Sequence, residues 1–178
     1  MNHRVLGTVA LLLSPMLLLQ GALNHFEAPG PTRLNAVIGL AFLLGWTCSA
    51  IGLRQVRATG RGVAALVLLM IQLTGLGLAA LQEVQDFIYT SWTPDTIFYD
   101  VCNAAWPISV VFMLVVEGFV LSARVMSGWQ RWTPGLCGLA VPLLIAIGSL
   151  LGRRPAVVVF GLYTCVAWAM LGAAVRSE

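Results

Sequence analysis

Apolar residues follow one another along this chain in six long runs, and short polar segments separate the runs. A helix needs about 20 consecutive apolar residues, within a range of roughly 17 to 25, to cross the hydrocarbon core of a bilayer. The pattern therefore predicts an all-α membrane protein: a compact bundle of six transmembrane helices in which residues 1–178 form a single domain. The predicted spans are 5–23, 36–53, 62–89, 101–122, 134–151 and 156–175.

The first run begins after Arg4 and therefore has the charged start of a signal peptide. Its apolar core of about 19 residues is longer than the roughly 7 to 15 residues of a cleaved signal. No clean small-x-small cleavage site follows it. We therefore expect this run to be retained as the first span.

Composition agrees with lipid as the surrounding solvent. Hydrophobic residues make up 59% of the chain and charged residues only 10%, against about 25% charged in soluble domains. The expected partner of the outer surface is therefore the lipid bilayer. The net charge of +3 is explained by arginines in the loops, so it indicates no nucleic-acid partner. The Arg-only, Ala/Gly/Leu/Val-rich usage favours a bacterial inner membrane as the location.

The arginines predict the orientation of the bundle, because basic residues are retained on the cytoplasmic side. With the N-terminus inside, the inner segments carry Arg4, Arg54, Arg57, Arg61, Arg124, Arg131 and Arg176. The outer segments carry only Arg33, Arg153 and Arg154. Both termini are therefore predicted to be cytoplasmic. The outer segment 82–100 agrees, since it contains no basic residue and four acidic ones: Glu83, Asp86, Asp95 and Asp100.

Helical periodicity predicts where the polar residues of the fourth run point. Steps of three and four connect Asp100, Asn103, Pro107, Val110, Leu114, Glu117, Leu121 and Arg124 in one stripe. Ionisable residues within a membrane nearly always face the interior of the bundle, so we expect Glu117 to point inward. The opposite faces are expected to contact lipid through Phe112, Met113, Val115, Val116 and Phe119.

The third run has a similar polar face, formed by Gln72, Gly75, Ala79, Glu83 and Asp86. Elements that follow one another in sequence usually pack together. We therefore expect this face to meet the stripe of the fourth helix and to form a polar seam. The predicted ligand- or ion-binding residues of the seam are Gln72, Glu83, Asp86, Asp100, Asn103 and Glu117.

Prolines and small residues indicate how the helices pack. Pro15, Pro107 and Pro142 each remove a backbone hydrogen bond and are expected to kink their helices. Small residues at steps of four permit close helix contacts. These ladders are Ala41, Gly45 and Ser49 in the second span, and Gly161, Cys165, Ala169 and Ala173 in the sixth. They predict either packing within the bundle or a homo-oligomer interface.

Glu117 has two interpretations. As a functional group it is a carboxylate that binds a proton or cation in a water-filled cavity. As a structural group it forms an ion pair with Arg54, Arg57, Arg124 or Arg176. A second polar group has two interpretations as well. The outer acidic cluster consists of Glu83, Asp86, Asp95 and Asp100 with Asn103, and it is within reach of Gln20, Asn24, His25 and Glu27. It either gathers cations or is a solvated loop.

Motifs for catalysis and cofactors are missing from the sequence. It contains no H-E-x-x-H and no G-x-S-x-G, so we assign no catalytic residue and keep an enzyme as the weaker alternative. His25 has only Glu27 beside it, and His3 belongs to the opposite side, so we predict no metal site. Without lysine the chain cannot form a Schiff base with retinal or pyridoxal, and no cofactor is predicted.

Two functional hypotheses remain. In the first, the protein binds or transports a small cationic or proton-linked solute through the polar seam. In the second, it is a non-transporting membrane module that binds a partner, senses a lipid or serves as an accessory subunit. In that case the polar groups are purely structural.

Overall fold

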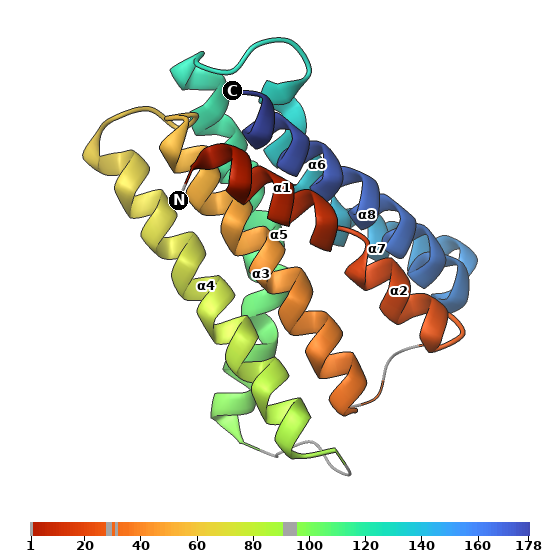
Figure 1. Cartoon of the computed structure of the whole chain (residues 1–178). Coiled ribbons are helices and arrows are strands. Elements are labelled where there is room, and N and C mark those ends of the chain that lie inside the picture. Colours follow the sequence, from red (N-terminus) through yellow and green to blue (C-terminus); the bar gives the residue numbers. More distant parts are fainter. Residues whose placement is uncertain (1, 28–29, 31, 91–95) are drawn as a thin grey trace.

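The computed structural model of the protein describes residues 2–27, 30, 32–90 and 96–178, and every regular element in these residues is a helix (Figure 1). Asp95 lies outside the described residues. The elements are α1 (His3–Leu13), α2 (Met16–Leu23), α3 (Arg33–Gln55), α4 (Val63–Ile88), α5 (Ile97–Ala123), the 3-10 helix η1 (Gln130–Trp132), α6 (Thr133–Gly138), α7 (Ala140–Leu151) and α8 (Arg153–Ser177).

Among the described residues, five helical stretches are long and apolar enough to cross a membrane. They are His3–Leu23, which joins α1 and α2, and the four long helices α3, α4, α5 and α8. A sixth span is obtained if Gln130–Gly138 and Ala140–Leu151, which meet at a bend of 47°, cross together. The all-helical prediction is confirmed, with five to six candidate spans.

The fifth predicted span, 134–151, is not one straight helix. It is divided between α6 and α7, which separate at Leu139. Pro142 explains the break, because proline has no N–H and its ring crowds the carbonyl group four residues earlier. That carbonyl belongs to Gly138, the last residue of α6. The predicted kink is therefore present, but it lies one turn before the proline.

The other two prolines differ in their effect. Pro15 lies in the short turn that separates α1 from α2, as the predicted kink requires. Pro107 lies inside α5, and the helix continues through it from Ile97 to Ala123. Membrane helices tolerate an interior proline where neighbouring groups satisfy the backbone carbonyl that the proline leaves without a donor.

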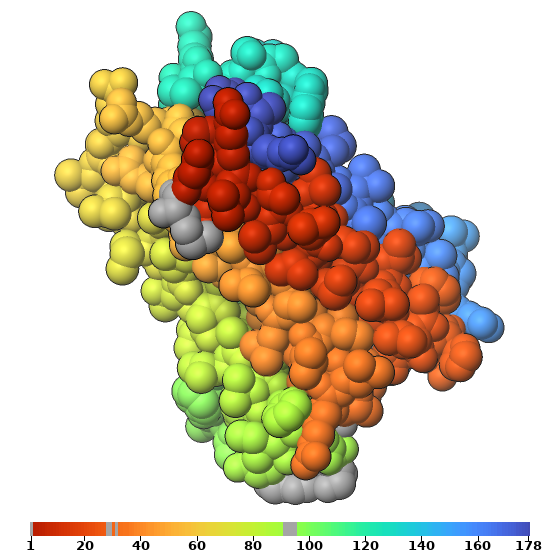
Figure 2. All heavy atoms as spheres, in the orientation of Figure 1, coloured from red at the N-terminus to blue at the C-terminus, as the bar shows by residue number. Residues whose placement is uncertain are grey.

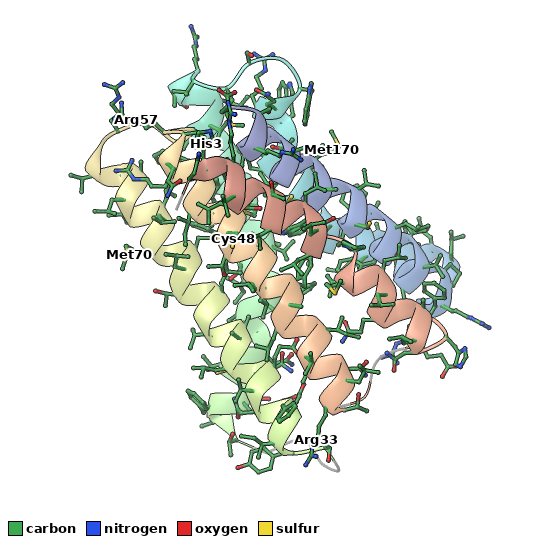
Figure 3. The ribbon with its side chains drawn as sticks, viewed as in Figure 1. His3, Arg33, Cys48, Arg57, Met70 and Met170 are labelled. Carbon is green, nitrogen blue, oxygen red and sulfur yellow. The ribbon has the colours of Figure 1, made fainter. Side chains whose placement is uncertain are left out.

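Both chain ends lie at one end of the bundle, together with the α3–α4 connection and the segment between α5 and η1 (Figure 1). The α7–α8 turn, the C-terminal end of α4 and the N-terminal end of α5 lie toward the opposite end. Figure 3 places His3 and Arg57 toward the first end and Arg33 toward the second. The segments at each end of the bundle are the same ones that the arginine count placed together on one side of the membrane.

Close packing joins α1, α3 and α8 through glycines. A Cβ atom on Gly7 would lie 2.6 Å from the backbone nitrogen of Arg176, and one on Gly45 would lie 2.8 Å from Cβ of Leu13. Figure 2 shows α1 and α2 lying over part of α8, with α3 beside them. The small residues Gly45 and Gly161 of the predicted ladders are therefore used within the chain: Gly45 faces α1, and Gly161 faces α2.

Aromatic rings fill the centre of the bundle. Trp46 of α3 and Trp168 of α8 meet edge to face at 5.1 Å between ring centroids, and Phe42 lies 5.2 Å from Trp168. All three side chains are buried. Large apolar side chains also cover the outside, as lipid contact requires; examples with more than half of their surface exposed are Leu12, Leu44, Ile108, Ile145 and Val166.

Candidate functional site

A cavity of about 500 Å³ opens at the end of the bundle opposite the chain termini. Residues of α2, α3, α4, α5, α7 and α8 line it. Four of the six predicted site residues are among them: Glu83 and Asp86 of α4, and Asp100 and Asn103 of α5. The structure therefore brings these four together, although the cavity is bounded by more helices than the two that the sequence predicts.

Asp86 is held in place by two side chains. It accepts a hydrogen bond from the Tyr99 hydroxyl (2.9 Å) and another from the Gln82 amide. Tyr99 is positioned by the start of α5, where the Thr96 hydroxyl accepts a hydrogen bond from the Tyr99 backbone N–H (3.2 Å). Thr96 is thus the N-cap of α5. The cap connects the local fold of α5 to the orientation of a carboxylate on α4.

Glu83 lies one turn deeper on α4, against the backbone of α3. Its carboxylate occupies the space that a side chain at Gly39 would fill, so the glycine makes room for it. Glu83 is half-buried and accepts no side-chain hydrogen bond from the described residues. Glu83 and the exposed Asp100 are the two carboxylates of the cavity that accept no side-chain hydrogen bond within the described residues.

Asp100 and Asn103 lie one turn apart on α5 and are exposed. Asp100 belongs to the first turn of the helix, where a negative charge interacts favourably with the helix dipole. Both side chains line the cavity beside Ala104 and Pro107. The end of α5 therefore contributes a charged and an amide group to one wall.

The opposite wall carries a network of amides from α2 and α3. Asn24 donates to Oδ1 of Asn35 (2.9 Å), and Asn35 donates to the carbonyl of Gly30 (2.9 Å). Gln20 donates to the backbone carbonyl of Asn35 (3.3 Å). Gln20 and Asn35 also line the cavity. Because these amides bond to one another, they hold α2 and α3 together and form a fixed polar wall.

The inner part of the cavity is apolar. Trp106 of α5 and Phe160 of α8 meet with their ring centroids 5.8 Å apart, and Val141 and Leu144 of α7 lie beside them. A ligand in the cavity therefore meets carboxylates and amides near the surface and aromatic and aliphatic groups further in.

The electrostatics of the cavity are one-sided. Three carboxylates and no arginine line it among the described residues. The nearby Arg33 lies over the ring of Phe87, 5.7 Å from its centroid, in a cation–π contact. A concave site lined by one sign of charge concentrates ions of the opposite sign. This arrangement suits a cation chemically.

Gln72 does not line this cavity. It is buried between α4 and α5, where its amide donates to the backbone carbonyl of Ser109 (3.4 Å) and its Oε1 has no partner among the described residues. Gly75, one turn away, lies directly against the Ser109 side chain. The prediction that the polar face of α4 meets α5 is therefore confirmed near Gln72 and Gly75, where the two helices pack tightly.

Glu117 is buried, as predicted, with 8% of its surface exposed. The prediction that Glu117 lies in the seam between α4 and α5 is wrong, however, because its side chain faces α6. Its Oε2 accepts a hydrogen bond from the backbone N–H of Gly135 (3.1 Å), and its Cγ would lie 3.0 Å from a Cβ at Gly135. The pattern of α5 placed Glu117 inside, but only packing determined which neighbour it meets.

The predicted arginine partners of Glu117 do not donate to it. Among the described residues, its one hydrogen bond comes from Gly135, and Oε1 has no hydrogen-bond partner. Arg54 donates instead to the carbonyl of Gly60 (2.9 Å). Glu117 is thus a buried carboxylate that is bonded to a backbone N–H.

The lipid-facing side predicted for α5 is partly wrong as well. Met113 and Val116 are 1% and 6% exposed and belong to the core. The physical reason is that α5 is covered on two sides, by α4 and by α6 and α7. A helix with two packed sides buries more than the single stripe that periodicity identifies.

Several residues of the cavity are absent from the predicted set. Tyr99, Gln82, Asn35 and Phe160 position its acidic groups or form its walls. In sequence, Tyr99 and Asn35 each follow a threonine by three residues, which is the spacing of an N-cap and its bonded N–H. That signal locates helix starts, but it does not indicate a shared cavity.

The comparisons with known proteins leave the site to be interpreted from its geometry. The chain matches no protein-family model, and no curated protein or solved structure shows significant similarity to it. Within the described residues, no group of at least three histidine, cysteine, aspartate or glutamate side chains is arranged to hold a metal ion.

Proposed function

We propose that this multi-pass membrane protein binds a small organic cation in the cavity formed by Glu83, Asp86, Asp100 and Asn103. The observation that carries the proposal is the convergence of three carboxylates in one cavity of about 500 Å³ that no arginine of the described chain lines. A volume of this size falls in the range of about 300 to 1,000 Å³ that is typical of small-molecule sites.

The composition of the walls favours an organic cation over a bare inorganic ion. Carboxylates lie on one side of the cavity, whereas Trp106 and Phe160 lie at its inner end. Aromatic rings attract alkylammonium groups through their π-face, by about 0.5 to 2 kcal/mol. A solute that carries both charge and apolar surface therefore gains from both parts of the cavity.

We further propose that the cavity opens on the outer side of a bacterial inner membrane. The count of arginines in the loops supports this orientation, with seven at the end that carries both termini and three at the other. The basic end is expected in the cytoplasm. The cavity is at the less basic end, so solute from outside would meet it first.

Transport through the bundle is the further step of this proposal. The residues between the cavity and Glu117 on α5 include Val110 and Met113, which are buried in the core with Leu76 of α4. Passage of a solute would therefore require α4 and α5 to rearrange. The closed packing supports binding as the function of this conformation, with transport as a property of another.

The second candidate is a non-transporting membrane module. The backbone hydrogen bonds of Gln72 and Glu117 favour it, because both groups are used to join neighbouring helices. In such a module the buried polar groups are structural, and the outer cavity alone is available to a ligand, lipid or partner.

The binding test is isothermal titration of tetramethylammonium into the purified protein in maltoside micelles. Glu83→Gln and Asp86→Asn are expected to weaken binding about fivefold each, since an exposed ion pair contributes up to about 1 kcal/mol. Glu27→Gln is the matched control, because Glu27 is an exposed carboxylate of the same end that does not line the cavity. Equal affinity in all four proteins would contradict the proposal.

Flux of tetramethylammonium into liposomes separates the two candidates. A transporter is expected to show flux that Glu83→Gln reduces, whereas a binding module shows affinity without flux. Glu117→Gln addresses the buried carboxylate that faces α6: flux that is unchanged in this variant would remove Glu117 from the transport mechanism.

A further inference from the structure

A second cavity of about 430 Å³ adjoins the acidic one. It lies between α2 and α7, both of which pack against α8. Leu17, Gln20, Leu144 and Phe160 line both cavities, so the two cavities share one boundary, and together they are called the groove. The groove extends from the acidic residues of the first cavity to Arg153 of the second.

The second cavity differs from the first in chemistry. Val157 and Ala156 of α8 line it with the shared leucines, and so do the three glycines Gly21, Gly148 and Gly161. Its charged group is Arg153, at the start of α8. The groove thus has carboxylates at one end, an apolar middle and an arginine at the far end.

We infer that the groove binds an amphiphilic cation, a molecule with an ammonium headgroup and a single alkyl chain. The headgroup lies at Glu83, Asp86 and Asp100, and the chain lies between α2 and α7. The opposite charges at the two ends determine this direction, because an ammonium group near Arg153 would be repelled. This inference rests on the proposed cation site and specifies the class of its ligand.

Shape and solvent support the same ligand class. The middle of the groove lies within the candidate spans, in line with residues such as Ile145 that face outward with 67% of their surface exposed. An alkyl chain therefore reaches the groove from the bilayer without crossing water. Buried chain carbons contribute about 0.8 kcal/mol each against water, and far less against lipid. Selectivity accordingly depends on the headgroup, with the chain setting how the ligand enters.

The experiment compares two probes on one set of variants in maltoside micelles. Dodecyltrimethylammonium is counted on the protein by native mass spectrometry, and tetramethylammonium is measured by calorimetry. Glu83→Gln removes headgroup charge, and Val157→Trp fills the part of the groove that the acidic cavity does not share. Leu162→Trp is the control for the larger ring, because Leu162 of α8 is 51% exposed. Partition of the amphiphile into micelles is the same for every variant, so differences among variants report the groove.

Binding of one dodecyltrimethylammonium is expected, weakened about fivefold by Glu83→Gln and about tenfold by Val157→Trp through steric exclusion. Tetramethylammonium binding should respond to Glu83→Gln alone, and Leu162→Trp should change neither affinity. Gly148→Leu replaces Val157→Trp if that variant does not fold, because a Cβ at Gly148 meets only ordinary contacts, the nearest at 3.7 Å.

The contrary outcomes are distinct. If Val157→Trp leaves dodecyltrimethylammonium binding unchanged while Glu83→Gln weakens both probes, the groove inference is overturned and the cation site stands. If dodecyl sulfate binds as tightly as dodecyltrimethylammonium and Glu83→Gln has no effect, the cation site is overturned, and the inference fails with it. If neither tetramethylammonium nor dodecyltrimethylammonium binds, both the cation site and the groove inference are overturned.

Discussion

The two ends of this bundle use the same chemical group in different ways. Near the α4–α5 connection, Glu83, Asp86 and Asp100 share a cavity of about 500 Å³. Near the chain termini, Glu117 is enclosed by the core and bonded to one backbone N–H of α6. A carboxylate with open oxygens is available to a ligand, whereas one enclosed by protein mainly joins two helices. Burial and hydrogen-bond partners, more than residue type, separate a candidate site from a structural contact.

The start of α6 explains why a carboxylate is useful at the end of the bundle near the chain termini. The first N–H groups of a helix have no partner within the helix. Glu117 accepts from one such group at Gly135, and the Tyr163 hydroxyl donates to the carbonyl of Leu136 (2.7 Å). Side chains of α5 and α8 thus stabilise a short helix that could not form alone.

The largest expected effect comes from removing the hydrogen bond between Glu117 and the backbone N–H of Gly135. Glu117→Ala leaves the buried N–H of Gly135 without its partner, which should lower the free energy of unfolding by about 2 kcal/mol. Glu117→Gln retains an acceptor oxygen and should recover most of that loss. Glu83→Ala should change stability by less than about 0.5 kcal/mol. Equilibrium unfolding in mixed micelles measures all three, and equal losses for Glu117→Ala and Glu83→Ala would refute the distinction between the two ends.

Water access distinguishes the two ends next. With the native cysteines replaced by alanine, a cysteine introduced at Asn103 should react with a water-soluble maleimide at least about tenfold faster than one restored at Cys102 or Cys137. Asn103 is exposed, whereas Cys102 and Cys137 are fully buried. Cys102 is the matched comparison, since it neighbours Asn103 on the same helix. Similar labelling rates at 102 and 103 would mean that the cavity wall is not hydrated.

Two glycines offer a matched pair of substitutions. A Cβ at Gly39 displaces the flexible end of Glu83, so Gly39→Ala should weaken tetramethylammonium binding about threefold with little loss of stability. A Cβ at Gly135 would lie 3.0 and 3.1 Å from Cγ and Cδ of Glu117. Gly135→Ala should therefore lower stability by about 1 kcal/mol and leave cation affinity unchanged. If Gly39→Ala lowered stability and Gly135→Ala weakened cation binding, the roles assigned to the two ends would be reversed.

The smallest expected effect is that of salt. Raising ionic strength from about 0.1 to 1 M shortens the screening length from about 10 to 3 Å, so cation affinity should fall about twofold. The stability loss caused by Glu117→Ala should not change, because that contact is shielded from solvent. A cation affinity that is independent of salt would indicate that the carboxylates do not attract the ligand by charge.

The sequence placed four of the six predicted site residues together, and the structure places the same four in one cavity. Glu83, Asp86, Asp100 and Asn103 meet because α4 ends and α5 begins near the same surface, and both of these helix ends carry polar residues. Gln72 and Glu117 were joined to them by helical periodicity alone. The structure separates these two, since residues on one face of a helix can meet different neighbours along its length.

The sequence by itself determined that the chain forms apolar helices, where these begin and end to within a few residues, and that acidic groups gather near the start of α5. These properties are local, because the length of an apolar run and its flanking polar residues act along the chain. Tertiary structure alone decided that α6 receives Glu117, that Met113 and Val116 are buried, and that α2, α7 and α8 complete the cavity. The rotation of each helix about its axis depends on how side chains of several helices interlock, and no single segment carries that information.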